Sequence, residues 1–294
     1  MSEYIYYPGC SLKTSGRHYD ESIITVFKEL GIELKELDDW NCCGATASPS
    51  VDEAKTSAIT GRVLALAEKS GKDILAPCAA CYMSLKKSKK FLENGSQKAE
   101  KILKALEDAG LPYKANVNVK HPVEILTKEI GMGKIKAKVI RNLNNIKIVN
   151  YYGCQIVRPF TEFDDPDYPT QMDDLMDALG LDVVDYSAKT KCCGGALTAN
   201  LEEPGLRLNY ILLKEAKRKG ADAIVTLCPL CLFNLEITQR KITKKYKEEV
   251  KIPVFFFSQL MGLSMGIPKE DLGFSRSMIP LKKFWEKVEN GGSK

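Results

Sequence analysis

Apolar and polar positions in the first half of the chain recur with two periods, one typical of strands and one typical of helices. Residues 4–7 form a short apolar run, and residues 33–37 alternate between polar and apolar positions, as a half-buried strand does. Between these two strands, apolar residues recur at helical spacing at Tyr19, Ile23, Phe27 and Leu30. Gly31 follows directly, where a helix is expected to end.

Two more strands are predicted in this half, at residues 73–76 and 117–120. A helix is predicted before them, beginning near Ser50 and reaching about residue 69. Ser50 and Glu53 have the spacing of a capping box, in which each side chain accepts a hydrogen bond from a free backbone N–H group of the first turn. This half therefore reads as strands separated by helices.

The second half repeats this order of elements. Strands are predicted at residues 146–151, 182–186, 223–227 and 254–257. Helix faces are predicted at Met172, Leu175, Met176 and Leu179, and again at Leu206, Tyr210 and Leu213. Strands that alternate with helices indicate an α/β fold, in which each half is a small, mostly parallel sheet flanked by helices.

The cysteines indicate that the two halves arose by duplication. The first cysteine set is Cys10, Cys42, Cys43, Cys78 and Cys81, and the second is Cys154, Cys192, Cys193, Cys228 and Cys231. In each set, 33 residues separate a Cys-Cys-Gly motif from a C-x-x-C pair. The gap before that motif is 31 residues in the first set and 37 in the second, where residues 162–167 predict a loop insertion. We expect two pseudo-twofold-related domains, residues 1–140 and residues 141–294 with a C-terminal tail.

Each cysteine follows the carboxyl end of a predicted strand. The carboxyl ends of parallel strands meet at one edge of a sheet, where open α/β sheets bind their ligands. We therefore expect the five thiols of each half to gather at that edge.

Composition narrows the chemistry of these thiols. Apolar residues make up 44% of the chain, charged residues 28%, and the formal net charge is +5. These values are typical of a globular protein and do not call for nucleic acid. The first residues do not have the pattern of a signal peptide, and no apolar run is long enough to cross a membrane, so we expect neither feature. We expect a cytoplasmic protein without membrane insertion, in which clustered cysteines bind metal or carry out redox chemistry rather than form disulfides.

Two metal sites compete for five thiols. Structural zinc uses C-x-x-C pairs but closes with four ligands, and His18 and His121 are the only histidines in the chain. Thiolates on neighbouring residues cannot easily reach one ion, whereas they can bind two irons of one cluster. Five thiolates also exceed the four of a cubane, so the pattern favours an iron–sulfur cluster, and a zinc scaffold remains the alternative.

The cysteine pattern of this sequence resembles that of a known family. The pattern C-x31-CCG-x33-C-x-x-C, repeated as C-x37-CCG-x33-C-x-x-C, resembles the duplicated cysteine-rich CCG domain, and residues 151–159, YYGCQIVRP, resemble the B-type subunit of heterodisulfide reductases. The resemblance implies one non-cubane [4Fe-4S] cluster per half, ligated by the first and second cysteine sets. It also implies catalytic reduction of the coenzyme M–coenzyme B disulfide to two thiols in methanogenesis, with one cluster acting on each sulfur.

The resemblance further implies partners. These are a ferredoxin-like C-type subunit with cubane [4Fe-4S] clusters, and a flavin-containing A-type subunit that connects to a hydrogenase or a formate dehydrogenase. The alternative within the same family is a chain that relays electrons in a lactate or glycolate oxidation system or in a quinone reductase.

The substrate of that family is polyanionic, so basic residues near the cysteines are candidates to bind it. They are Lys13, Arg17, Arg158, Lys189 and Lys191. His18 is a candidate proton donor, although a surface histidine is the simpler interpretation. His121 ends a predicted strand at the cysteine edge and is a candidate hydrogen-bond donor to cluster sulfur.

Overall fold

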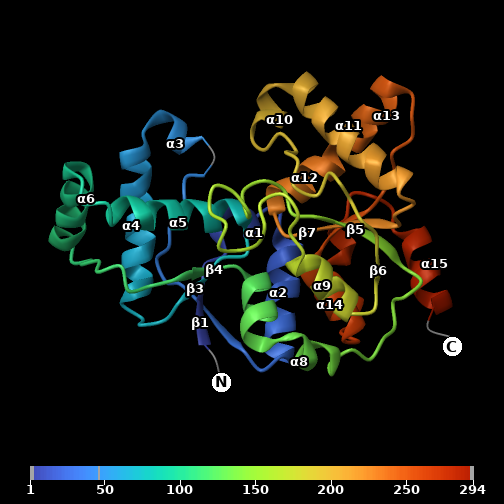
Figure 1. The fold of residues 1–294 in the computed structure, drawn as a ribbon, viewed down its shortest axis with the longest axis horizontal. Helices are drawn as coiled ribbons and strands as arrows, with labels where there is room; N and C mark the ends of the chain where they lie inside the picture. Colours follow the sequence, from blue (N-terminus) through green and yellow to red (C-terminus); the bar gives the residue numbers. More distant parts are fainter. Residues whose placement is uncertain (1–2, 46, 292–294) are drawn as a thin grey trace. The chain divides into compact units, whose positions relative to one another are not determined.

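The computed structural model of the protein describes residues 3–45 and 47–291, which form two compact units (Figure 1). The first unit contains the segment up to Thr14 together with Phe27–Pro122, and the second contains Ser15–Val26 together with the chain from Val123 onward. The predicted domains, 1–140 and 141–294, follow the sequence repeat and stay a prediction. Packing instead assigns two segments of the first repeat, Ser15–Val26 and residues 123–140, to the second unit.

The first unit is built on a four-stranded parallel sheet of order β2-β1-β3-β4. Its strands are β1 (Glu3–Tyr6), β2 (Glu33–Glu36), β3 (Ile74–Leu75) and β4 (Val119–Lys120). Its helices include α1 (Gly9–Leu12), α3 (Ser48–Val51), α4 (Glu53–Glu68), α5 (Ala79–Leu92) and α6 (Gln97–Asp108). All three strand pairings are parallel, so the four carboxyl ends share one edge.

The second unit repeats that sheet in the order β6-β5-β7-β8, again with parallel pairings throughout. Its strands are β5 (Lys147–Tyr151), β6 (Asp182–Val183), β7 (Ala223–Thr226) and β8 (Val254–Phe256). Its helices include α8 (Met132–Lys136), α9 (Gln171–Ala178), α10 (Leu197–Asn200), α11 (Glu202–Arg218), α12 (Pro229–Ile237), α13 (Gln239–Tyr246), α14 (Phe257–Ser264) and α15 (Lys282–Gly291). The predicted α/β class and the duplicated parallel sheets are confirmed.

One local prediction is wrong. Helix α4 is capped by Asp52, whose carboxylate accepts a hydrogen bond from the Lys55 N–H group at 3.0 Å, and not by Ser50. Ser50 lies inside the short helix α3, which ends just before Asp52. A carboxylate is as good an N-cap as a hydroxyl and also favours the positive end of the helix dipole.

The C-terminal tail packs onto the second sheet. The Phe284 ring of α15 lies 4.7 Å from the Phe255 ring of β8, and the Trp285 ring lies 5.0 Å from the Phe274 ring, centroid to centroid. Phe274 and Phe284 are buried, and Met278 remains exposed. Within residues 3–45 and 47–291, no helix is long and apolar enough to cross a membrane.

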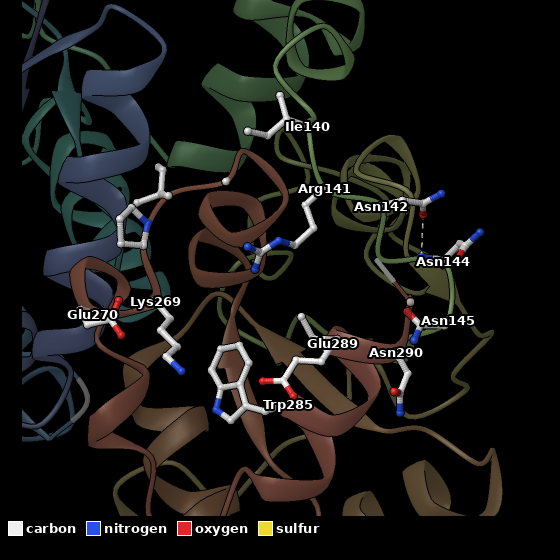
Figure 2. Close-up of a pocket in the computed structure, with 15 residues that line it drawn as sticks. Ile140, Arg141, Asn142, Asn144, Asn145, Lys269, Glu270, Trp285, Glu289 and Asn290 are labelled. Atoms are coloured by element: carbon white, nitrogen blue, oxygen red, sulfur yellow. Dashed lines mark hydrogen bonds between the residues drawn. The ribbon is translucent and has the colours of Figure 1, made fainter. Parts of the chain in front are cut away.

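A cavity of about 1100 Å³ opens beside this tail. Figure 2 shows the Arg141 side chain and the Trp285 ring directed into it, with Lys269 and Glu289 at its sides. The Lys269 ammonium lies 5.2 Å from the centre of the Trp285 ring. None of the residues that line this cavity is a cysteine, so it is separate from both cysteine sets.

The first part of helix α2 (Arg17–Glu29) packs within the second unit. The Tyr19 ring stacks on the Phe256 ring at 4.1 Å, the Ser22 and Ser258 hydroxyls lie 2.7 Å apart, and the His18 ring lies 4.8 Å from Phe256. His18 is only 5% exposed, so its interpretation as a surface residue is wrong. The reason is tertiary, because β8 covers a helix face that is polar in sequence.

Burial makes His18 a source of acid sensitivity. The pKa of His18 is lowered to about 4, and desolvation by burial is the largest cause. The nearby Arg276 acts in the same direction, whereas Glu21 opposes it. An unfolded chain takes up a proton near pH 6.5 while the folded chain does not. The stability that His18 contributes is therefore complete above pH 6.5 and is lost as the pH falls toward 4.

We predict that the wild-type protein loses about 1 kcal/mol of unfolding free energy between pH 7.5 and pH 5.5 through His18 alone. In His18→Gln this loss should disappear, because glutamine does not titrate. Anoxic denaturant titrations of both proteins at the two pH values measure it. An equal loss in the variant would exclude His18 as the source.

Candidate metal centres

The first cysteine set lies in the first unit, in the loops that leave three neighbouring strands. Cys10 lies in α1 after β1, the Cys42–Cys43 pair lies in the loop after β2, and Cys78 caps α5 after β3. Cys81 lies in the first turn of α5. The helix dipole favours negative charge at that end, which suits a thiolate.

The thiols of this set lie in contact with one another. The Sγ atoms of Cys42 and Cys10 are 3.7 Å apart, and those of Cys43 and Cys81 are 3.3 Å apart. Cys78 in turn hydrogen-bonds the Cys81 thiol. The five thiols therefore gather at the carboxyl edge of the sheet, as their positions after the predicted strands indicated.

The second cysteine set repeats this arrangement in the second unit. The Cys193 and Cys231 Sγ atoms lie 3.6 Å apart, Cys154 hydrogen-bonds Cys192, and Cys228 hydrogen-bonds Cys231. Cys228 caps α12, as Cys78 caps α5. None of the ten cysteines, which all lie within the described residues, forms a disulfide bond.

A glycine allows the backbone to approach each set closely. Gly9 has a φ of +65°, and a Cβ atom added to it would lie 2.8 Å from the Cys81 Sγ atom. Gly153 has a φ of +71°, and its added Cβ would lie 3.0 Å from the Cys231 Sγ atom. Both positions therefore require glycine twice over, for the left-handed backbone and for the space beside a sulfur.

Matched tyrosines hold the two Cys-Cys-Gly motifs in place. The Tyr7 hydroxyl donates to the Asn41 carbonyl at 2.8 Å, and the Tyr151 hydroxyl donates to the Lys191 carbonyl at 2.7 Å. Each acceptor residue directly precedes the cysteine pair of its half. Both tyrosines are fully buried, so the bonds fix the motifs against the sheets.

Polar side chains that the sequence analysis missed fix the second cysteine of each motif. In the first unit, the Thr60 and Ser84 hydroxyls donate to the Cys43 carbonyl at 3.1 and 3.0 Å. In the second unit, the Asn209 amide and the Thr198 hydroxyl donate to the Cys193 carbonyl at 2.9 and 3.0 Å.

A further residue, Asn234, reaches the Cys193 sulfur itself, with 3.5 Å between its Nδ2 atom and Sγ. A signal for Ser84 and Asn234 was present in the sequence. Each follows the last cysteine of its C-x-x-C pair by three residues, about one helical turn.

The thiols within a set differ in acidity. A hydrogen bond from Cys42 is the largest of the effects that lower the pKa of Cys43 to about 3. A hydrogen bond from Cys154 likewise lowers the pKa of Cys192 to about 6. A hydrogen bond from Cys231 also lowers the pKa of Cys193. Because the thiolate is the form that binds metals, each Cys-Cys-Gly motif provides at least one thiolate at neutral pH.

Each set has a buried side and an open side. Cys43, Cys78 and Cys81 are each 3% exposed, whereas Cys10 and Cys42 are exposed. The second set repeats this, with Cys193, Cys228 and Cys231 buried, Cys154 half-buried and Cys192 exposed. A group held by either set is therefore shielded on one side and accessible on the other.

A cavity adjoins each Cys-Cys-Gly motif. In the first unit it measures about 600 Å³, begins at Asn41 and is mainly apolar, with Ile59, Ile102 and Leu106 in its walls. In the second unit it measures about 700 Å³ and includes Cys192 itself. Apolar residues such as Leu208 and Ile211 line this second cavity together with four basic residues, Lys191, Arg207, Lys214 and Arg218.

Of the predicted substrate-binding residues, Lys191 shares a cavity with a cysteine of the second set. It is exposed and lines the cavity that contains Cys192. Lys13 pairs with Glu36 at 2.8 Å, Arg17 pairs with Glu21 at 3.4 Å, and Arg158 donates to the Thr190 carbonyl at 3.0 Å.

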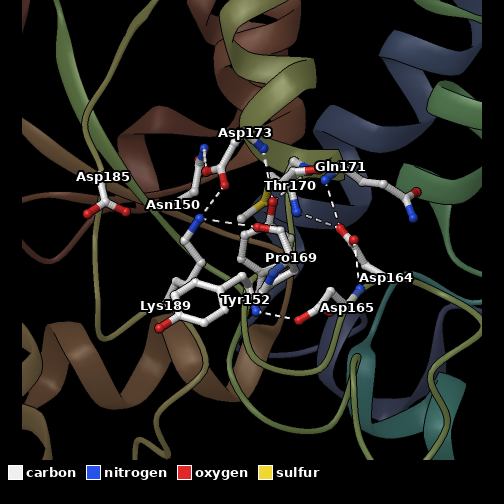
Figure 3. Close-up of polar contacts among 12 residues, drawn as sticks. Asn150, Tyr152, Asp164, Asp165, Pro169, Thr170, Gln171, Asp173, Asp185 and Lys189 are labelled. Atoms are coloured by element: carbon white, nitrogen blue, oxygen red, sulfur yellow. Dashed lines mark hydrogen bonds and ion pairs between the residues drawn. The ribbon is translucent and has the colours of Figure 1, made fainter.

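Lys189 forms part of a buried network (Figure 3). Its ammonium pairs with the Asp173 carboxylate, donates to the Pro169 carbonyl at 3.2 Å and is only 11% exposed in its side chain. Tyr152 accepts from the Asp173 N–H group at 3.0 Å. The predicted loop insertion at residues 162–167 is confirmed as an irregular loop, and its Asp164 carboxylate accepts hydrogen bonds from the Thr170 and Gln171 N–H groups at 2.8 and 2.7 Å.

His121 supports the backbone beside the first cysteine set. Its Nε2 atom is 2.8 Å from the Pro77 carbonyl oxygen, and the residue is fully buried. Pro77 precedes Cys78, so His121 fixes the backbone that carries the thiol. Its predicted bond to cluster sulfur stays a prediction.

The donor set fits a multi-iron cluster. Five sulfurs gather in each half, one more than the four that a cubane cluster or a zinc site takes from protein, and a glycine beside one of them makes room for that sulfur. Among residues 3–45 and 47–291, no group of three or more histidine, cysteine or acidic side chains is arranged around one metal ion.

Comparison with known proteins agrees with the duplication. A model of the cysteine-rich domain, CCG, matches residues 4–86 and 148–236. The chain is 31% identical to the 8-methylmenaquinol:fumarate reductase membrane anchor subunit of Wolinella succinogenes, over 96% of this chain and 99% of the relative. It is 29% identical to the B subunit of the ferredoxin/F420H2-dependent CoB-CoM heterodisulfide reductase of Methanosarcina acetivorans, over 98% and 97%.

A solved structure shares the fold. It is a hypothetical protein from Helicobacter pylori, with a TM-score of 0.78 at 15% identity, over 94% of this chain and 51% of that longer chain. The two family matches cover the cysteines of both units, and the two relatives match over almost their whole length. The chain therefore belongs to the cysteine-rich CCG-domain family and carries that domain twice.

Proposed function

We propose that this chain is the disulfide-reducing B-type subunit of a heterodisulfide reductase complex. The observation that carries the proposal is the presence of two complete five-cysteine sets, one at the carboxyl edge of each sheet. The similarity to the B subunit of a heterodisulfide reductase over nearly the whole chain supports it. The reaction takes one disulfide, two electrons and two protons to two thiols.

Each cysteine set would hold one non-cubane [4Fe-4S] cluster. Such a cluster, when bound, supplies single electrons and an iron with affinity for sulfur. The buried thiols, among them Cys43 and Cys81, would exclude water from its inner side. The exposed Cys42 and Cys192 would border its outer side, where a substrate sulfur has access.

The duplication would serve the two sulfurs of one disulfide. A single one-electron donor would leave a sulfur radical, whereas two matched sets let each half bind one sulfur and deliver one electron to it. Tyr7 and Tyr151 would keep the two motifs equivalent, because they fix the same backbone position in each half. Preorganised ligands of this kind avoid rearrangement during the reaction.

Anionic ends of the substrate would bind at the cavity that contains Cys192. Lys191 and Arg207 line it, and Arg207 lies over the Tyr210 ring at 5.8 Å. Lys214 and Arg218 line it too but already pair with carboxylates. Lys13 and Lys189 also pair with acidic residues, which leaves Lys191 the strongest of the candidates from the sequence.

Electrons would arrive from a partner with cubane [4Fe-4S] clusters, of the ferredoxin-like C type. A flavin-containing A-type subunit, with a hydrogenase or formate dehydrogenase behind it, would complete the complex. The sequence contains no nucleotide-binding glycine motif of its own, so electrons must come through another chain. We expect this complex to be cytoplasmic.

A second candidate function is quinol-linked electron relay. The 31% identity to a subunit of an 8-methylmenaquinol:fumarate reductase favours it. The apolar cavity beside Asn41 also fits an aliphatic quinone better than a polyanion. The two candidates therefore differ in the compound that reacts at the exposed side of the cysteine sets.

The deciding experiment is an anoxic assay of the purified complex. We expect about eight irons per chain, given two four-iron clusters, together with reduction of the coenzyme M–coenzyme B disulfide by a reduced dye. Turnover with a menaquinol analogue but not with the disulfide would favour the relay. Absence of iron and sulfide from the native protein would overturn both.

Substitution of one exposed cysteine in each half tests the two-site mechanism. We expect Cys42→Ala and Cys192→Ala each to lower disulfide reduction at least about tenfold, because each removes a ligand from a different set. Normal steady-state turnover in either single variant would contradict a need for both halves. Iron analysis of the same samples separates loss of a cluster from loss of reactivity.

Gly9→Ala tests the close approach of the backbone to sulfur. We expect it to lower iron occupancy of the first half, because the new methyl group would meet the Cys81 sulfur. Gly31→Ala is the matched control. Its φ of +73° gives a similar backbone strain of about 1 kcal/mol, but nothing lies within 4 Å of its added Cβ. Equal iron content in both variants would contradict the steric argument.

Lys191→Ala tests the anion site. We expect the KM for the anionic disulfide to rise about tenfold with kcat little changed, because a charge-assisted contact used in ground-state binding is lost. Lys214→Ala, which removes a cation of the same cavity that already pairs with Glu248, is the control. Similar effects of both substitutions would assign the result to general charge.

A further inference from the structure

The two cysteine sets are matched in their ligands but differ at one supporting position. Ser84 follows Cys81 by three residues in α5, and Asn234 follows Cys231 by three residues in α12. Both side chains are buried, at 4% and 3% exposure. They therefore occupy the same place in the two repeats while carrying different hydrogen-bonding groups.

Ser84 has one proton to donate, and it donates that proton to a backbone carbonyl. Its Oγ atom lies 3.0 Å from the Cys43 carbonyl oxygen. A hydroxyl carries a single donor, so this bond uses its whole donor capacity. The Cys43 sulfur therefore receives no proton from Ser84.

Asn234 has two protons, and its amide nitrogen faces four acceptors. The Nδ2 atom lies 2.9 Å from the Gly195 carbonyl, 3.3 Å from the Thr198 hydroxyl and 3.4 Å from the Cys193 carbonyl. It also lies 3.5 Å from the Cys193 Sγ atom. Carbonyls and a sulfur ligand call for a donor here, which fixes the orientation of the amide.

The second repeat also supplies other donors for the carbonyl. Asn209 and Thr198 already donate to the Cys193 carbonyl, at 2.9 and 3.0 Å, which is shorter than the contact from Asn234. With that carbonyl satisfied, one N–H group of Asn234 is directed at the Gly195 carbonyl. The second N–H group is shared between the Thr198 hydroxyl at 3.3 Å and the Cys193 sulfur at 3.5 Å. In the first repeat, Ser84 and Thr60 are both engaged by the Cys43 carbonyl.

We propose that Asn234 makes the cluster of the second cysteine set the more easily reduced of the two clusters, through its N–H group on the Cys193 sulfur. The inference rests on the proposed clusters. A donor to a ligand sulfur stabilises the additional negative charge of the reduced state, which raises the reduction potential. The first electron to arrive would therefore reside on the second half, and the first half would be the stronger reductant.

Asn234 acts through Cys193, so it is a positioning residue and its effect is measured as a potential. We expect anoxic redox titration of the wild-type protein, followed by electron paramagnetic resonance, to give two transitions. Asn234→Ser should move the higher transition to a more negative potential and leave the lower one in place. Ser84→Asn should move the lower transition to a more positive potential and leave the higher one in place.

The reciprocal design keeps the test decisive. If Asn234→Ser loses the second cluster, which iron analysis detects, Ser84→Asn still tests the same interaction in the intact half. Two transitions that stay unmoved in both iron-replete variants would overturn the role of Asn234 while leaving the cluster proposal intact. A native protein without iron would instead remove the proposed function itself.

Discussion

The geometry of both centres depends on the parallel direction of every strand. In a parallel sheet all carboxyl ends lie at one edge, and the loops that follow them converge there. One antiparallel strand would send its cysteines to the opposite edge, about a strand length away. Sulfur–sulfur distances of 3.3 to 3.7 Å between loops some 30 residues apart are possible only under this constraint.

Close packing around the sulfurs then limits which residues the loops accept. Glycine is required where the backbone touches Cys81 and Cys231, since any side chain would collide with the sulfur. Buried tyrosine hydroxyls hold the residue before each cysteine pair. The two halves agree in these features, so both features belong to the duplicated domain itself.

The two halves differ in the residues that surround their cysteine sets. The cavity at Asn41 is mainly apolar, whereas four basic residues are among those that line the cavity at Cys192, although both adjoin the same motif. Ser84 in one half corresponds to Asn234 in the other. Duplication followed by divergence around the cysteines thus gives two sites with the same five thiols and different surroundings.

The amino-acid sequence alone was enough to predict the alternation of strands and helices in each half, the duplication and the convergence of the cysteines. The duplication follows from the matched spacing of the cysteines. The positions of strands and helices follow from the periodicity of apolar residues, which depends on local interactions. Even there one detail failed, since Asp52 rather than Ser50 caps α4, and a one-turn helix intervened.

The side chains that surround those cysteines could be identified only from the tertiary structure. It showed that Lys189 is neutralised by Asp173, that His18 is covered by Phe256, and that the Asn234 amide reaches the Cys193 sulfur. Each of these contacts joins residues on different elements, between 16 and 238 positions apart, and no periodicity of the sequence encodes such a pairing. Burial and charge partnership are properties of the packed chain, so they become visible only when the elements meet.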